Sequence, residues 1–370
     1  MAKETKKYWL ILGLAVFFIY VFAAAQPIPV ETILVPRWLT SLESNYPLNV
    51  GGSSPEAGAP PLVFELGERF GYVGDDGRFT MNHLKKGYVS LSEEHWAEYE
   101  TLPQTIEIMD PHDNTVLELE NPKGYPLFLD RRFFIIGPEQ NSLTALDPEG
   151  NELWTYDFPA PLTCIDAAAG FVLVGTLDGT VELLNPQGRQ VFPPFEPGGS
   201  RLSVILGCAI SRDASRLAII SGVDDQRFLL LEQSGDTYRV VYHEFLTDGF
   251  RRAVHTAFID SDSRVAFERE GGIGIYDILS RTSVNIPLDG EITALDGSGA
   301  PRGASGGGDH LFFVITSQSG VQKKFIAIRS PGTIAMEAPF RSRSAFLKRR
   351  GSKIYVGGDT ALASFELGKK

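Results

Sequence analysis

Residues 142–150 read SLTALDPEG, a mostly apolar run from Ser142 to Asp147 that continues into the turn Asp-Pro-Glu-Gly. In such a turn the aspartate accepts hydrogen bonds from its own backbone, proline presets φ, and Gly150 takes the position that needs φ > 0. The stretch therefore predicts a β-strand that ends in a tight turn. Six other segments share an apolar run that ends in a polar residue. They are Thr105–Asp110, Thr180–Asn185, Arg227–Glu232, Gly272–Asp277, Lys324–Arg329 and Ala361–Glu366.

These segments recur every 37 to 52 residues, counted between their last residues. That period is typical of β-propellers, in which each blade is a small sheet. The sequence therefore predicts an all-β fold, a seven-bladed β-propeller. Eight blades remain possible, because Phe70–Tyr99 holds more strand-forming residues than half a blade needs.

The blade count also predicts how the ring closes. Six units contain enough strand-forming segments for a complete blade. Their approximate bounds are residues 70–119, 125–156, 162–192, 203–243, 253–287 and 291–338. The last unit, residues 343–367, lacks a fourth strand. We expect Leu62–Leu66 to pair beside Ala361–Leu367, which would close the ring and remove exposed strand edges.

The polar residues of the repeat are predicted to be structural. The turn after Asp147 recurs at Asn185-Pro186-Gln187-Gly188, and a related turn follows Glu232. Side chains that bond the backbone of a turn have a structural task there, so we do not interpret these acids as catalytic. The structural repeat residues are Asp110, Asp147, Gly150, Trp154, Asn185, Gly188, Glu232, Asp277 and Glu366.

Leu143–Trp154 resembles the repeat of quinoprotein-like (PQQ-type) β-propellers, which has Ala-x-Asp, a glycine three residues later and a tryptophan four residues after that. Ala145, Asp147, Gly150 and Trp154 match this pattern, whereas the copy Leu183–Phe192 has phenylalanine in place of the tryptophan. Cys208–Ala218 is similar to the inner strand and turn of WD40 repeats. The resemblance covers about residues 62–367 and implies that Trp154 packs blade against blade.

The resemblance implies the non-enzymatic branch of that family. Quinone-dependent dehydrogenases of this type are larger, carry many tryptophan repeats, bind Ca²⁺ and often have adjacent cysteines. This chain has one matching tryptophan, four tryptophans in all and no Cys-Cys pair. The branch it resembles consists of anchored extracytoplasmic propellers that bind proteins, including a bacterial outer-membrane assembly factor. We therefore expect no cofactor and no enzymatic activity.

The N-terminus predicts export. Lys3, Lys6 and Lys7 precede Tyr8–Ala25, a run of 18 residues without charge. A run of this length can cross a membrane as a helix, and the lysines keep its N-terminal side in the cytoplasm. The small residues at 23–25 equally fit a cleaved signal peptide. Either reading places the rest of the chain outside the cytoplasm, and the anchor places it on the periplasmic side of the inner membrane.

Three parts of the chain are therefore expected: an anchor or signal peptide at residues 1–25, a tether at 26–61 and a propeller at 62–370. The tether is rich in proline and glycine, a composition that buries little apolar surface. Within it, Val35–Leu42 with Trp38 is expected to be partly ordered linker or a short interfacial turn of helix.

The net charge of −12 argues against nucleic acid or anionic lipid as the main partner, because both require a basic surface. One stretch departs from this balance and is read as solvated blade loops, with a docking patch for an acidic partner as the alternative. Its basic residues are Arg341, Arg343, Lys348, Arg349 and Arg350.

No catalytic or metal-binding motif stands out. None of the six histidines forms a close pair with the spacing of metal ligands. They are His83, His95, His112, His243, His255 and His310. Asp260–Ser263 resembles part of a Ca²⁺ loop but lacks its glycine and distal glutamate, so we expect a β-turn. Gly297–Asp309 is expected to be a mobile loop, and Cys164 and Cys208 to be small buried side chains, although a disulfide stays open.

We therefore expect a membrane-anchored propeller that binds another protein of the bacterial envelope. A small-ligand or glycan sensor and a propeller enzyme with a central-channel site are the alternatives. A scaffold requires an apolar or aromatic patch on one loop face. A sensor requires a deep pocket with exposed aromatic rings. An enzyme requires acids and histidines that converge in the channel with perturbed pKa values.

Overall fold

The computed structural model describes residues 13–18, 20, 32–44, 48–49, 59–101, 103–246, 249–296, 311–329 and 332–369. The chain divides into a large compact unit, Val35–Glu366, and a small one formed by Met1–Leu34 and Leu367–Lys370. In the small unit, residues 13–18 are helical. Among the described residues, no helix has the length and apolar character needed to cross a bilayer. Most of Tyr8–Ala25, and the glycine-rich Gly297–Asp309, lie outside the described residues.

The described part of the chain forms eight sheets. The strands of the first four, in chain order, are β3 (Leu62–Leu66), β4 (Arg69–Val73), β5 (Phe79–Leu84); β6 (Tyr88–Leu91), β7 (Trp96–Tyr99), β8 (Thr105–Met109), β9 (Thr115–Glu120); β10 (Tyr125–Leu129), β11 (Arg132–Ile136), β12 (Ser142–Leu146), β13 (Glu152–Asp157); and β14 (Leu162–Ala168), β15 (Phe171–Thr176), β16 (Val181–Leu184). In the fourth sheet, isolated bridges at Gln190 and Phe195 stand where a fourth strand would be.

The other four sheets follow the same plan. Their strands are β17 (Ile205–Ile210), β18 (Arg216–Ser221), β19 (Arg227–Ser234), β20 (Thr237–Phe245); β21 (Thr256–Ile259), β22 (Arg264–Arg269), β23 (Gly272–Asp277), β24 (Thr282–Pro287); β25 (Glu291–Asp296), β26 (Leu311–Ser319), β27 (Gln322–Arg329), β28 (Thr333–Arg341); and β29 (Phe346–Arg350), β30 (Lys353–Gly358), β31 (Ala361–Lys369), with β1 (Thr32–Ser41) and β2 (Leu48–Asn49) beside them.

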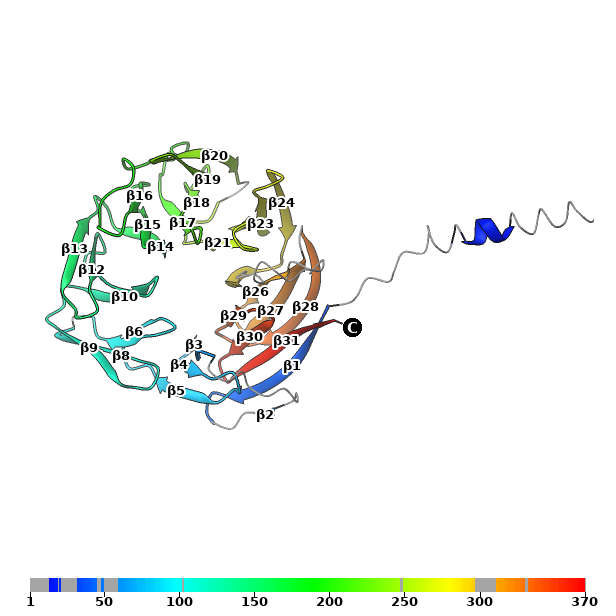
Figure 1. Cartoon of the computed structure of the whole chain (residues 1–370), viewed down its shortest axis with the longest axis horizontal. Coiled ribbons are helices and arrows are strands. Elements are labelled where there is room, and N and C mark those ends of the chain that lie inside the picture. The colour runs from blue at the N-terminus through cyan, green and yellow to red at the C-terminus, as the bar shows by residue number, and fades with distance from the viewer. Residues whose placement is uncertain are drawn as a thin grey trace, which may run out of the picture. The chain divides into compact units, whose positions relative to one another are not determined.

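Within residues 35–366 the sheets stand around a central axis as the blades of a propeller (Figure 1). The first strand of each blade lies nearest the centre, as β6, β10, β14, β17 and β21 do, and the last lies at the rim. The pairings between successive strands of a blade are antiparallel, so the turns after the first and third strands reach one face of the ring. The turns after the second strand reach the other face.

Packing between blades explains why the strands are so apolar. Middle strands such as β18 and β22 are buried over almost their whole length, since a neighbouring blade covers each side. Each large core cluster joins two sheets. In one of them Leu173 and Leu183 from one blade meet Ile205 and Leu217 from the next, and all four are completely buried. A blade therefore buries its apolar surface only between two others.

The chain has eight blades, the number that the sequence allowed as its alternative to seven. The difference comes from the first predicted unit, residues 70–119, which contains the end of one blade (β4 and β5) and the whole of the next (β6–β9). The later predicted units each correspond to one observed blade. The extra strand-forming residues of the first predicted unit, at Phe70–Tyr99, are those that pointed to an eighth blade.

The ring is closed by an N-terminal strand, but the predicted strand was the wrong one. Leu62–Leu66 (β3) pairs with β4 in its own blade, whereas β1, from the predicted tether, lies beside β31 in the last blade. Val35–Leu42 is thus largely a strand rather than linker or helix. Pro36 obscured it, since proline is unusual inside a sheet. It is tolerated because β2 pairs only with Trp38 and Leu39 among the described residues.

Side chains of β1 hold the last blade together and fasten it to the first blade. Arg37 forms an ion pair with Glu366 on β31. Trp38 is only 4% exposed, packs against Gly77 and donates its indole N–H to the carbonyl of Asp75 at 2.8 Å. Gly77 has φ +83°, and a Cβ there would lie 2.7 Å from the indole ring. The ring is therefore closed by a tryptophan that fits against a left-handed glycine.

We expect Trp38→Ala to lower the free energy of unfolding by about 3–5 kcal/mol, because it removes a large buried side chain at the junction of two blades. Leu39→Ala is the matched control on the same strand, since Leu39 is 43% exposed. It should cost less than about 1 kcal/mol. Urea unfolding measures the free energy of unfolding of both variants. It is followed by far-UV circular dichroism rather than by tryptophan fluorescence, since one variant lacks a tryptophan. Equal losses in the two variants would contradict closure through Trp38.

Candidate functional site

The repeated polar residues mostly organise turns. Oδ1 of Asp147 accepts hydrogen bonds from the N–H groups of Glu149 (3.0 Å) and Asn151 (2.7 Å). Asp110 and Asn185 make the equivalent pair of bonds two and four residues on. The side-chain amides of Asn151 and Asn114 also donate to Asp147 and Asp110, at 2.9 Å in each case. These amides are the main cause of a lowered pKa at both aspartates, and the backbone bonds add to it.

The remaining acids of the repeat have different partners. Asp277 accepts hydrogen bonds from the N–H and hydroxyl of Ser280. Glu232 pairs with Arg216 at 2.8 Å, and Glu366 pairs with Arg37. The structure therefore does not bring these residues together, and they lie in separate blades.

Trp154 and Gly188 meet between two blades. Gly188 has φ +73°, and a Cβ there would lie 2.4 Å from the Trp154 ring. The indole N–H donates to the carbonyl of Pro186 at 3.1 Å. Gly150 is approached in the same way by Leu117 and Leu119 of the preceding blade. The glycines of these two turns therefore leave room for a large side chain of the neighbouring blade.

Carboxylates near the centre of the ring also join neighbouring blades. Each accepts a hydrogen bond from a backbone N–H of the next blade. The pairs are Asp130 with Gly170 (2.8 Å), Asp166 with Ile210 (2.9 Å) and Asp296 with Arg349 (2.8 Å). Burial raises the pKa of Asp166, although its bonds to backbone N–H groups oppose that rise. These three carboxylates are thus already hydrogen-bonded to backbone N–H groups.

Two of the described histidines pack against aromatic rings, and His310 lies outside the described residues. His83 contacts Asp113 at 3.1 Å and packs edge-on against Trp96. His95 packs edge-on against Phe133, and burial lowers its pKa. Within the described residues no three histidine, cysteine, aspartate or glutamate side chains lie together as a metal site would require.

The cysteines and the basic stretch are placed as follows. Cys164 and Cys208 are free thiols that pack against one core cluster, and burial raises the pKa of Cys208. The basic stretch is not a solvated loop as a whole, because Phe346–Arg350 is strand β29. Arg349 is only 5% exposed, and its guanidinium donates to the carbonyl of Leu311.

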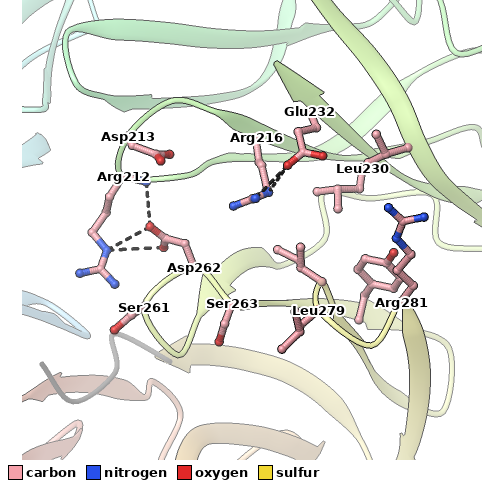
Figure 2. A pocket seen from close by; sticks show the side chains of 13 residues that line it. Arg212, Asp213, Arg216, Leu230, Glu232, Ser261, Asp262, Ser263, Leu279 and Arg281 are labelled. Carbon is pink, nitrogen blue, oxygen red and sulfur yellow. Dashed lines mark hydrogen bonds and ion pairs between the residues drawn. The ribbon is translucent and has the colours of Figure 1, made fainter. Parts of the chain in front are cut away.

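A groove of about 720 Å³ opens between the blade β17–β20 and the blade β21–β24 (Figure 2). Leu230 and Tyr276 form its floor and are 1% and 2% exposed. The Tyr276 ring stacks on Tyr242 of the other blade with centroids 4.0 Å apart, which makes the floor rigid. Above the floor stand Val241, 47% exposed, and Leu279, 94% exposed. We call this site the inter-blade groove.

Charged side chains line the rest of the inter-blade groove. Arg212 reaches across to Asp262 of the next blade, with Nε 3.2 Å from Oδ2, and Figure 2 shows the pair on one side. Arg216 is paired with Glu232. Arg281 has no ion-pair or hydrogen-bond partner among the described residues. The groove therefore combines exposed apolar side chains with one arginine available to a ligand.

Two local features shape this groove. The turn from Asp260 to Asp262 has three successive residues with φ between +51° and +64°, a conformation that costs free energy in residues other than glycine. On the other blade, Asp213 accepts hydrogen bonds from the hydroxyl and N–H of Ser215, which lower its pKa to about 2. Asp260–Ser263 is a turn, as its sequence predicts, but the sequence gives no sign of the groove that the turn lines.

Leu279 and Arg281 were also missed as candidate residues. Their signal was present, since Leu279 is a large apolar residue inside the turn that follows Asp277. Turns are normally polar, so an apolar side chain there indicates a contact. Only the structure shows that Val241 and Tyr276 come from other strands to the same place.

Three comparisons relate the chain to known proteins. A family model described as beta-propeller protein matches residues 1–369. An uncharacterized protein of Treponema pallidum (strain Nichols) is 26% identical over 297 residues, which cover 79% of this chain and 78% of that protein. BamB from Moraxella catarrhalis superposes with a TM-score of 0.60 at 13% identity, over 90% of this chain and all of BamB. The computationally designed Ika8 protein gives 0.55 at 12%, over 84% and 98%.

We expect Asp166→Ala to lower the free energy of unfolding by about 1–3 kcal/mol, because it leaves the N–H of Ile210 without its acceptor. Asp166→Asn is the control that keeps an oxygen acceptor and should cost less. The raised pKa of Asp166 adds a pH dependence, since an unfolded aspartate ionises near its ordinary 3.8. The unfolding free energy of the wild type should therefore fall relative to the Asn variant as pH rises from about 4 through the raised pKa. Urea unfolding at several pH values would show the opposite trend if Asp166 were unburied.

Proposed function

The chain belongs to this family of beta-propeller proteins, and from that premise we propose that it is an exported scaffold that binds another protein of the bacterial envelope. The binding site of this scaffold is the inter-blade groove. The N-terminal segment sends the propeller across the inner membrane and, if it is retained, anchors it there. No catalytic step is assigned to the chain.

The exposure of Leu279 above a buried aromatic floor carries this proposal. A leucine that is 94% exposed has no stabilising role in the isolated chain. Energetic hot spots of protein interfaces are apolar or arginine side chains that become desolvated among well-packed neighbours. Leu279 and Val241 supply apolar surface next to the stacked rings of Tyr242 and Tyr276. A partner side chain that fills the groove would bury Leu279 and Val241 against the Tyr276 ring.

The charges of the groove support a partner with a carboxylate near its apolar anchor. Arg212 and Arg216 are already paired with acids of this chain, so they fix the walls. Arg281 is free to form an ion pair with the partner. A bidentate bond between arginine and carboxylate fixes orientation as well as adding affinity.

The proposed location rests on the sequence. Lysines followed by 18 uncharged residues are typical of an inner-membrane anchor or a signal peptide. The quinoprotein-like resemblance implies anchored extracytoplasmic propellers. The likeness to BamB is one of fold, since identity is 13%.

A photo-crosslinking amino acid in place of Leu279 should give one discrete crosslinked product in the native host. Val116 is the control, because it is 45% exposed and lies outside the groove on β9, the outer strand of another blade. Adding Arg281→Glu should reduce the yield at position 279 about tenfold, which corresponds to ~1.4 kcal/mol. Arg189→Glu, an exposed arginine outside the groove, should leave the yield unchanged. Equal products at 279 and 116 would exclude the groove as the binding site.

Export is tested separately with alkaline phosphatase, which is active only outside the cytoplasm, fused after Pro61. We expect full activity with residues 1–61 and none when residues 1–25 are deleted. An N-terminal epitope tag then separates the two forms of the segment, because a retained anchor keeps the tag and a cleaved signal peptide loses it. An inactive fusion with the complete segment would refute export.

A further inference from the structure

A second cleft, of about 560 Å³, lies on the face opposite the inter-blade groove. Its tyrosines come from the start of β6 (Tyr88), the end of β7 (Tyr99) and the start of β10 (Tyr125). Gln140, in the turn between β11 and β12, also lines it. These positions are at the ends of strands reached by second-to-third-strand turns, whereas the groove is lined by turns after first and third strands. We call this site the tyrosine cleft.

The three tyrosines form a continuous aromatic strip. The rings of Tyr88 and Tyr99 lie 5.9 Å apart between centroids at an interplanar angle of 28°. Tyr99 and Tyr125 have the same separation at 34°. Tyr88 is 60% exposed, although large aromatic side chains usually lie inside a fold. This strip of inclined rings offers flat apolar surfaces to a ligand with flat or ring-shaped side chains.

The backbone beneath the strip is held in place. The hydroxyl of Ser90 on β6 donates to the carbonyl of Pro126 on β10, so the inner strands of two blades are joined under the tyrosines. The Thr163 hydroxyl, on the next inner strand, donates to the carbonyl of Gly175 at 3.0 Å. The cleft is thus preformed, which reduces the entropy lost on binding.

The chemistry of the cleft selects an uncharged ligand that accepts hydrogen bonds. None of its lining residues has a charged side chain, in a chain that carries a net charge of −12. Among the described residues, the hydroxyls of Tyr88, Tyr99 and Tyr125 and the side-chain amide of Gln140 have no hydrogen-bond partner. These groups can donate to a ligand, and no carboxylate is present to accept the many donors of a carbohydrate.

We propose that the tyrosine cleft binds an uncharged, proline-rich segment of a partner protein in the polyproline II conformation. Proline has no N–H to donate, and a polyproline II helix leaves its backbone carbonyls free to accept hydrogen bonds. Aromatic-lined grooves are the recurring receptors of such segments, with rings that fit between successive prolines. The tyrosine hydroxyls can donate hydrogen bonds to the carbonyls of the segment, and the tyrosine rings can pack against its pyrrolidine rings. This site is independent of the inter-blade groove.

Binding of a blocked octaproline peptide to the full chain, measured by titration calorimetry, tests this proposal. We expect saturable binding that Tyr99→Ala weakens at least about tenfold. Changing all three tyrosines to phenylalanine keeps the rings and removes the hydroxyls, and should give a smaller loss. Phe245→Ala, at an aromatic residue that is 59% exposed outside the cleft, should have no effect. Urea unfolding of each variant separates a lost site from a lost fold.

Other outcomes overturn the proposal. One is the absence of binding at about 1 mM octaproline, a concentration high enough to reveal even a weak peptide site. Another is binding that Tyr99→Ala leaves unchanged in a folded variant. A third is binding of maltoheptaose, but not octaproline, that depends on Tyr99, which would make the cleft a glycan site. None of these results bears on crosslinking at Leu279, so the two sites are tested apart.

Discussion

The fold depends on the burial of apolar surface between blades. A blade is a small sheet whose two faces are both apolar, and it has almost no core of its own. Every sheet must therefore be covered by two others, and in the part of the chain that the structure describes this is achieved by closing the sheets into a ring. Closure requires that the first and last blades meet. The strand β1 belongs to the last blade and provides that contact through Trp38, while Arg37 ties β1 to β31 inside the last blade.

At several places around the ring, polar groups and turn glycines also join neighbouring blades. Tryptophan or leucine fits against the left-handed glycine of a neighbouring turn, and carboxylates near the axis accept N–H groups of the next blade. These bonds occupy acids that could otherwise be mistaken for a catalytic cluster. What the ring leaves unoccupied is at its two faces, where Leu279 and Arg281 stand on one and the tyrosine strip on the other.

Much of the architecture follows from the sequence, because a blade is encoded locally. The turn at Asp147–Gly150 and its copies reveal the period, and the later blades begin and end close to the predicted residues. The predictions were wrong where the secondary structure of a segment depends on residues far away in the sequence. Thr32–Ser41 contains Pro36 and follows a proline-rich stretch, so its composition favours a linker, yet pairing with β31 makes it a strand. The sites were not predicted for the same reason, since the rings of Tyr88, Tyr99 and Tyr125 share a surface only after two blades have packed together.

The ion pair between Arg37 and Glu366 joins residues 329 positions apart, so its two halves are made at nearly the opposite ends of synthesis. Blades built from consecutive segments can pack in order as the polypeptide emerges. The last blade, in contrast, combines β1 with strands that are made much later. Until the last residues of the propeller arrive, that early strand can pair only with β2, and its other edge is open to pairing with another molecule. The seam can therefore form only when synthesis of the propeller is nearly complete, later than any contact between blades that follow one another in the sequence.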